Sequence, residues 1–229
     1  MIRVEDRDDV RVVTIDRPEK RNALAPETLV DLRAAVTGAE TPVVHLTGAG
    51  GAFSAGADFD SVTAAAAADD AEAFVRRGQE TMTAIEDAES VVVAGVDGPA
   101  RGGGVELALA CDVRVATPDA TFAETGVRLG LFGAWGGTHR LPAVVGLGDA
   151  MDLSLSGRTL DAAAAHRIGL VQRVVDDPLA VSEELAGNDA AALRVLKRRL
   201  RAHDRVEAQE RAEREAFADL LAAYAERQE

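Results

Sequence analysis

A run of three glycines followed by a helical pattern is the segment of this sequence best suited to chemistry. Residues 102–108 read GGGVELA, and Glu106 lies about one helical turn after the glycines begin. Glycine lets the backbone approach a ligand closely, and the first amides of a helix have no intrahelical partner. Such amides can hold an oxygen that gains negative charge during a reaction. Glu106 would then act as a general base or acid on the substrate held there.

Residues 102–108 also allow a purely structural interpretation and two nucleotide-binding interpretations. A glutamate in the first turn of a helix is favoured by the helix dipole alone, so Glu106 does not require a catalytic role. A dinucleotide-binding fingerprint needs a third glycine at its sixth position, where Leu107 stands, and is rejected. No lysine follows any glycine run, as a phosphate-binding loop would require.

A second loop of small residues, at 49–59, follows an apolar segment that is typical of a strand. Backbone at the end of a strand in such a loop is often placed against a ligand. Within it, Ser54 lies in a sequence one glycine short of the nucleophile elbow of serine hydrolases. That alternative would need a base from His139, His166 or His203. The four histidines show no metal-ligand spacing, and the single cysteine excludes a thiolate cluster and an intrachain disulfide.

Strand and helix patterns alternate around these two loops. We expect strands at residues 10–15, 43–48, 91–98 and 113–116, and helices from Pro26, at 74–88, at 102–110 and from about 189 to the end. Residues 62–73 are too weakly patterned to assign to a helix or a loop. Repeated units of this kind predict an α/β fold in which helices cover the sheets.

The composition limits the partners of the chain. A formal net charge of -14 and a pI of about 4.7 argue against binding to nucleic acid or to an anionic membrane. The same acidic surface leads us to expect a halophilic protein that loses stability on desalting. The first residues are charged, and no run of 18 or more apolar residues occurs, so we expect a cytoplasmic protein.

Several segments resemble, in order and spacing, the crotonase superfamily, which is the enoyl-CoA hydratase/isomerase family. The matching segments are residues 17–24 (RPEKRNAL), 48–59, 97–116, 121–131, 135–146 and 157–175. The first looks like the family's CoA-contacting loop, and the second and third look like its two oxyanion loops. The resemblance implies a crotonase-like spiral of ββα units, which we expect over residues 1–186. A shortened helical C-terminal region would follow over residues 187–229.

The resemblance also implies a site. The amides of Ala57 and Gly103 would hold the oxygen of an acyl-CoA thioester, and Glu106 would be the first of the two catalytic glutamates of the hydratases. CoA would arrive as part of the substrate, with no other cofactor and no metal. The chain would assemble as a homotrimer or a dimer of trimers. Residues expected along the CoA path are Ala23, Leu24, Ala55, Asp58, Phe59 and Gly102.

The sequence departs from the family pattern at one important position. Gly126 stands where hydratases carry their second glutamate, and Glu124 lies two residues earlier. Glu124 could substitute for that glutamate only if the chain bends there, because residues two apart in a strand are separated by about 6 to 7 Å. Our first prediction is an enoyl-CoA hydratase-like lyase. A malonyl-type acyl-CoA decarboxylase, an enoyl-CoA isomerase and a non-catalytic acyl-CoA-binding homologue remain alternatives.

Overall fold

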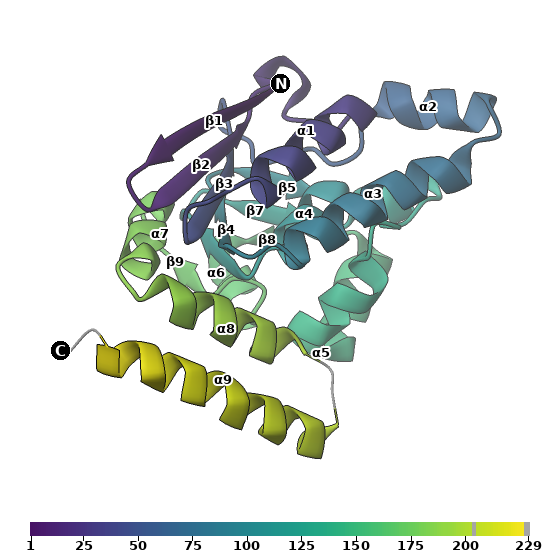
Figure 1. The fold of residues 1–229 in the computed structure, drawn as a ribbon. Coiled ribbons are helices and arrows are strands. Elements are labelled where there is room, and N and C mark those ends of the chain that lie inside the picture. Colours follow the sequence, from purple (N-terminus) through teal and green to yellow (C-terminus); the bar gives the residue numbers. More distant parts are fainter. Residues whose placement is uncertain (203–204, 227–229) are drawn as a thin grey trace.

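A six-stranded sheet forms the centre of the computed structural model, which describes residues 1–202 and 205–226 (Figure 1). Its strands, in spatial order, are β1 (Ile2–Arg7), β2 (Val10–Ile15), β3 (Val43–Gly48), β4 (Val91–Val96), β6 (Val113–Ala116) and β9 (Arg173–Val174). Strand β1 is antiparallel to β2, and the other neighbours are parallel. A smaller sheet contains β5 (Pro99–Arg101), β7 (Thr121–Ala123) and β8 (Leu160–Asp161).

The predicted strands at 10–15, 43–48 and 113–116 have the expected bounds, and the one at 91–98 ends two residues earlier. All six residues of β4 are buried, which explains why its sequence is a continuous apolar run rather than an alternating one. Strand β1 was not predicted, because its mostly exposed residues at the edge of the sheet are polar and charged.

The helices cover the sheet and connect its strands. They are α1 (Pro26–Thr37), α2 (Phe59–Ala67), α3 (Ala71–Glu86), α4 (Gly103–Ala110), α5 (Gly137–Ser156), α6 (Ala162–Arg167), α7 (Pro178–Ala186), α8 (Ala190–Arg201) and α9 (Val206–Glu226). Short 3-10 turns, η1 (Pro18–Lys20) and η2 (Thr125–Leu129), lie in two connections. The weakly patterned segment 62–73 contains most of α2, a turn and the start of α3.

Helix α4 lies in the middle of the molecule, and all eight of its residues are buried. It packs against both α3 and α5, and its apolar side chains belong to the main core. A helix that is buried all round has an apolar sequence all round, so any charged residue on it needs a specific partner. Glu106 is that residue.

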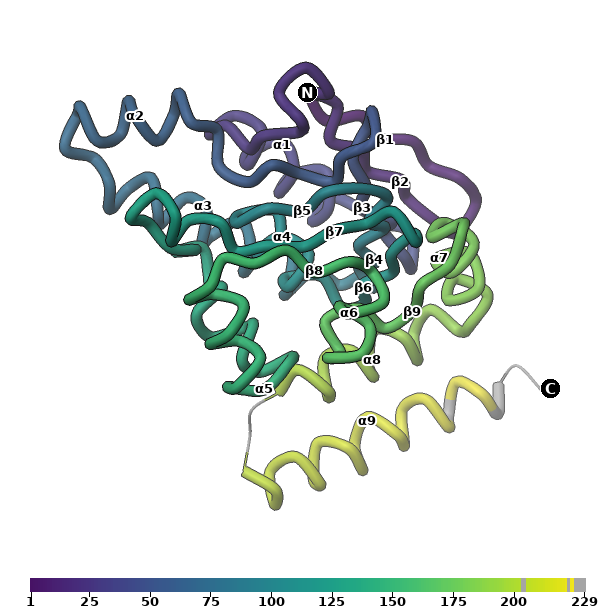
Figure 2. Tube along the Cα trace, turned by 180° about the vertical axis from the view of Figure 1, so that it is seen from behind, coloured from purple at the N-terminus to yellow at the C-terminus, as the bar shows by residue number. Residues whose placement is uncertain are grey.

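The C-terminal segment is two helices rather than one continuous helix. Figures 1 and 2 both show α9 beyond α8, on the side away from the sheet. Helix α8 is anchored through Lys197, whose Nζ donates a 2.8 Å hydrogen bond to Ser90 O. Helix α7 ends at Ala186, and a division of the chain between residues 186 and 187 stays a prediction. None of the described helices combines the length and apolar character needed to cross a membrane.

Candidate active site

Two backbone loops meet at the N-terminus of α4. Arg101 N donates to Ser54 O at 2.9 Å, and Ser54 N donates to Pro99 O at 3.2 Å. A Cβ atom on Gly56 would lie only 2.8 Å from Gly103 N, which is closer than side chains pack. The first predicted oxyanion loop therefore lies directly against the second.

The amides of Ala57 and Gly103 are both free to bind a ligand. Leu24 forms a parallel bridge with Ala57, using its own N–H and C=O toward the residues on either side of Ala57. In such a bridge the N–H of Ala57 points away from Leu24. Gly103 is the first residue of α4, so its N–H has no intrahelical acceptor. Within the described residues neither amide donates a hydrogen bond, and together they form an unused pair of donors.

Glu106 lies buried where α4 meets the N-terminus of α5, with only 2% of its surface exposed. Its Oε1 accepts hydrogen bonds from Trp135 N at 2.7 Å and from Gly137 N at 2.8 Å. Burial raises the pKa of Glu106, and the two amides and the charge of Arg140 act in the opposite direction. Complementing the dipole of its own helix does not account for this arrangement, because the carboxylate is held at the N-terminus of a different helix.

A chain of ion pairs connects this site to the C-terminal helix α8. Glu86 Oε1 pairs with Arg201 of α8, and Glu86 Oε2 pairs with Arg140, both at 2.5 Å. Arg140 Nη1 also donates to Trp135 O at 3.1 Å. Because Trp135 N–H donates to Glu106, the chain ends at the carboxylate of the candidate base. Helix α8 thus braces the segment that holds Glu106.

Glu124 lies at a bend directly after β7. Ala123 ends the strand, and η2 begins at the residue after Glu124. The structure therefore contains the bend that would allow Glu124 to replace a carboxylate at Gly126. Glu124 is 6% exposed, and its Oε1 has no hydrogen-bond partner within the described residues. Burial, with the neighbouring charge of Glu106, raises the pKa of Glu124 to about 8.

A cavity of about 280 Å³ lies beside the first loop. It is lined by Glu19, Lys20, Arg21, Ala23, Ala55, Ala57, Asp58, Phe59 and Asp60. Most of the residues predicted along the CoA path therefore share one cavity with Ala57, the first of the two predicted oxyanion residues. Two of them do not line it. Leu24 is fully buried, and Gly102 caps α4 with a φ of 46°.

The serine hydrolase alternative finds no support. Ser54 is fully buried, and its hydroxyl donates to Asn22 O at 2.8 Å and accepts from the amide two residues further on at 3.1 Å. This hydroxyl therefore holds the loop in shape. Neither His139 nor His166 makes a hydrogen bond to Ser54, and His203 lies outside the described residues.

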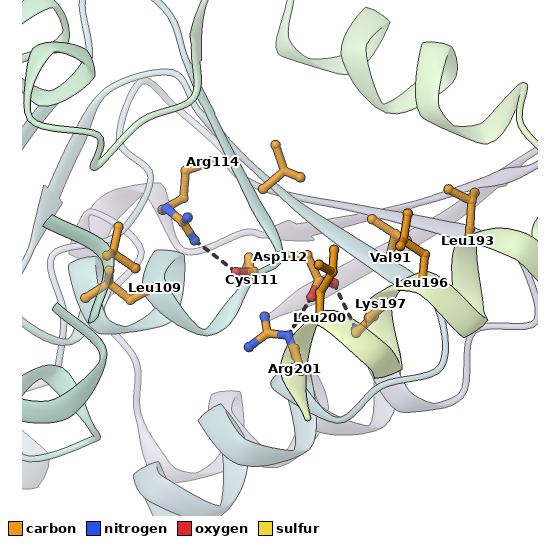
Figure 3. Close-up of a pocket in the computed structure, with 12 residues that line it drawn as sticks. Val91, Leu109, Cys111, Asp112, Arg114, Leu193, Leu196, Lys197, Leu200 and Arg201 are labelled. Carbon is orange, nitrogen blue, oxygen red and sulfur yellow. Dashed lines mark hydrogen bonds and ion pairs between the residues drawn. The ribbon is translucent and has the colours of Figure 1, made fainter. Parts of the chain in front are cut away.

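A larger cavity, of about 380 Å³, lies where α8 packs over α4 and the strands beside it (Figure 3). Its acidic residue, Asp112, pairs with Lys197 and with Arg201, each at 2.8 Å. Burial raises the pKa of the Cys111 thiol in its wall to about 12. No predicted site residue lines this cavity, and its charged residues are one acid, Asp112, and three bases, Arg114, Lys197 and Arg201.

The geometry can be compared with known proteins. The family model for enoyl-CoA hydratase/isomerase matches residues 5–229. A crotonyl-CoA hydratase from Syntrophomonas wolfei is 41% identical to this chain, over 75% of the chain and 68% of the relative. The chain belongs to the enoyl-CoA hydratase/isomerase family. It is an enoyl-CoA hydratase-like acyl-CoA enzyme, as the sequence predicted.

Solved structures of this family share the fold. An enoyl-CoA hydratase from Thermoplasma volcanium has a TM-score of 0.90 and 31% identity, covering 96% of this chain and 92% of that one. A Thermobifida fusca protein solved in complex with acetoacetyl-CoA has a TM-score of 0.85 and 30% identity, covering 97% and 95%. The prediction of a crotonase-like α/β fold is thus confirmed.

Sequence reasoning missed the residues that hold the candidate base of this family member. Glu106 accepts hydrogen bonds from the backbone amides of Trp135 and Gly137, and the charge of Arg140 acts on it. No sequence motif predicts contacts of this kind. It also did not single out Lys20 and Arg21 at the cavity of the first loop. Their signal was available, because both lie in the RPEKRNAL segment that resembles a CoA-contacting loop.

Proposed function

We propose that the protein adds water across the double bond of a 2-enoyl-CoA thioester, with Glu106 as the general base. The thioester oxygen accepts hydrogen bonds from Ala57 N–H and Gly103 N–H. Glu106 takes a proton from water as the water oxygen bonds to the β-carbon, and the electron pair of the double bond moves toward the thioester oxygen. Donors of this type contribute roughly 3 to 4 kcal/mol each to the transition state.

One observation carries the proposal. Glu106 Oε1 is held by two amides, whereas its Oε2 makes no hydrogen bond within the described residues and is free for water. A base fixed through one oxygen keeps the other in a defined direction. The relatives support the same reaction class, since one is a crotonyl-CoA hydratase and another was solved with acetoacetyl-CoA.

The test is the variant Glu106→Gln, which keeps the shape of the side chain but cannot accept a proton. Hydration of crotonyl-CoA should fall by roughly two to four orders of magnitude. Calorimetric binding of CoA should stay close to that of the parent. The matched control is Glu89→Gln, which changes an exposed glutamate and should leave turnover unaltered. Hydration at the parental rate in Glu106→Gln would refute the proposal.

A malonyl-type decarboxylation is the second candidate, because position 126 carries no carboxyl group. Loss of CO2 from methylmalonyl-CoA leaves the same enolate for the two amides to stabilise, without a second acid. The two substrates are therefore assayed side by side by mass spectrometry. Carbon dioxide release without hydration assigns the decarboxylase. Binding without turnover of either assigns the non-catalytic homologue, and movement of the double bond assigns the isomerase.

We propose a homotrimer or a dimer of trimers as the working assembly. Apolar side chains exposed on the two C-terminal helices support it, and they are Leu196, Leu200, Val206, Phe217, Leu221 and Tyr224. Helices that expose several large apolar side chains are typical of contacts between subunits.

A further inference from the structure

Position 126 is a glycine and carries no carboxyl group, and the backbone around it packs closely. A Cβ atom on Gly126 would lie 3.2 Å from the carbonyl carbon and oxygen of Leu131 and 3.3 Å from Phe132 Cα. These are backbone atoms, and they would have to give by a few tenths of an ångström to admit a side chain. An acid that serves the α-carbon must therefore come from another position.

Glu124 lies at the same end of the site as the oxyanion amides. Strand β7 pairs in parallel with β5, and Gly102 N donates to Ala123 O at 3.0 Å. This bond places the residue that follows Ala123 beside the glycine that caps α4. The carboxyl group of Glu124 is also close enough to Glu106 for the charge of Glu106 to act on it.

The carboxyl group of Glu124 is buried without a fixed partner. Its Oε1 makes no hydrogen bond within the described residues, and such a buried group costs roughly 1 to 3 kcal/mol. Two carboxyl groups that feel each other's charge do not readily ionise together. Glu106 accepts two amide hydrogen bonds and is the one suited to be ionised, so Glu124 keeps its proton. A neutral carboxyl group beside a carboxylate is suited to donate that proton.

From these contacts we propose that Glu124 is the acid that protonates the substrate α-carbon. This inference rests on the proposed function and names its second catalytic residue. The water oxygen bonds to the β-carbon as the double bond opens, and Glu106 takes the proton of the water. The electron pair, held as the enolate by the two amides, then forms the α-C–H bond with the proton of Glu124. The net reaction adds one water, and transfer of a proton from Glu106 to Glu124 through solvent restores the pair.

Butyryl-CoA separates the two glutamates experimentally. It is saturated, so exchange of its α-protons with D2O requires no addition of water. It requires a base at the α-carbon, which is the ionised form of Glu124, the reverse of the proton donation proposed for hydration. We expect Glu124→Gln to slow this exchange by roughly two orders of magnitude or more. In Glu106→Gln the exchange should stay within about tenfold of the parent, because the water-activating group is not needed.

Asp97→Asn is the matched control for the loss of a buried carboxyl group. Asp97 Oδ1 also lacks a partner within the described residues, and burial raises the pKa of Asp97, but Glu106 does not contribute to that shift. This variant should exchange at the parental rate. Retained cooperative melting and CoA affinity in Glu124→Gln show that its loss of exchange is chemical. If that variant does not fold, Glu124→Asp is used, and it should move the pH dependence of exchange.

Exchange in Glu124→Gln within about threefold of the parent would overturn the inference. A parental pH profile that Glu124→Asp leaves unmoved would overturn it as well. The outcome is independent of the hydration assay. A parent that exchanges butyryl-CoA through Glu124 but does not hydrate crotonyl-CoA would refute the hydratase proposal and leave the role of Glu124 at the α-carbon intact.

Discussion

Glu106 and Glu124 are two carboxyl groups that the fold buries in different electrostatic surroundings. Glu106 accepts two amide hydrogen bonds at the N-terminus of α5, and both favour its ionised form. Glu124 Oε1 accepts no bond within the described residues. Groups whose environments separate their pKa values in this way are suited to opposite proton-transfer roles. Addition of water requires this asymmetry, because one group takes a proton from the water that bonds to the β-carbon and the other gives a proton to the α-carbon.

The raised pKa of Glu124 makes stability depend on pH. In the folded chain the pKa is about 8, against 4.5 for an ordinary glutamate. Between these values the unfolded chain loses the proton first, so stability falls as pH rises from 4.5 toward 8. Glu124→Gln lacks this fall. Urea denaturation should show that, between pH 5 and pH 8, the free energy of unfolding of the parent falls relative to that of Glu124→Gln. The change in the difference should reach as much as roughly 4 kcal/mol. A constant difference between the two proteins would contradict the shift.

At the scale of residues, the sequence predicted the candidate site residues that lie in a recognisable motif, but not those whose position depends on the tertiary structure. Gly103 and Glu106 lie in a glycine-helix pattern whose chemistry follows from the residue types and their spacing alone. The position of Glu124 depends on the bend between β7 and η2, and the residues that follow it, Thr125 and Gly126, do not form a pattern that predicts this bend. The sequence therefore predicts the participation of Glu124 only on the condition that the chain bends there.

At the scale of elements, the site depends on helices that meet end to end. The N-terminus of α4 supplies one of the two candidate oxyanion amides, and the N-terminus of α5 supplies an amide to Glu106. The start of α5 is fixed by Arg140, which links Trp135 O to Glu86 on α3. Arg201 of helix α8 forms an ion pair with the same residue, Glu86. Elements distant in sequence therefore determine how firmly the candidate base is held.

Arg140→Met tests this support. The variant removes the bond to Trp135 O and one ion pair of Glu86, so we expect a loss of roughly 1 to 3 kcal/mol in stability. It should also lower kcat for crotonyl-CoA more than it changes KM, because Glu106 is less firmly placed. Arg158→Met is the control, since its ion pair with Asp152 is half exposed and contributes at most about 1 kcal/mol. Equal effects of the two substitutions would argue against the bracing role.

Elements with a strong pattern were predictable, and those determined by tertiary contact were not. Strands β2, β3 and β6 are Val-rich and bounded by turn residues, and their limits followed from the sequence. Strand β1 exists because its backbone pairs with β2, whatever its polar side chains prefer. The start of α2 depends on the Asp58 carboxylate, which accepts from the amides of Asp60 and Ser61.

At the scale of the molecule, negative charge exceeds positive charge by 14. Repulsion between like charges opposes the compact state. Dissolved salt weakens this repulsion, because the distance over which charges interact becomes shorter as the salt concentration rises. Among the described residues several ion pairs are exposed, and these contribute little to stability. Salt should therefore stabilise the protein overall.

Raising KCl from 0.1 to 2 M should increase Tm by roughly 2 to 4 °C, which is the shift that about 1 kcal/mol of stabilisation gives in a chain of this size. Light scattering on the same samples should give a trimer of about 72 kDa from chains of 23.9 kDa, or twice that mass. A Tm independent of salt would refute the halophilic interpretation. A monomeric mass at both concentrations would refute the assembly.

Trp135 is the only tryptophan of the chain, and it lies against both halves of the site. A Cβ on Gly103 would lie 2.6 Å from its ring, its amide donates to Glu106, and its ring is 5.7 Å from that of Phe74. Indole fluorescence responds to nearby charge and polarity. The whole tryptophan emission of this protein therefore arises beside the candidate oxyanion amides, and the chain carries a built-in optical probe with which ligand binding can be followed without a label.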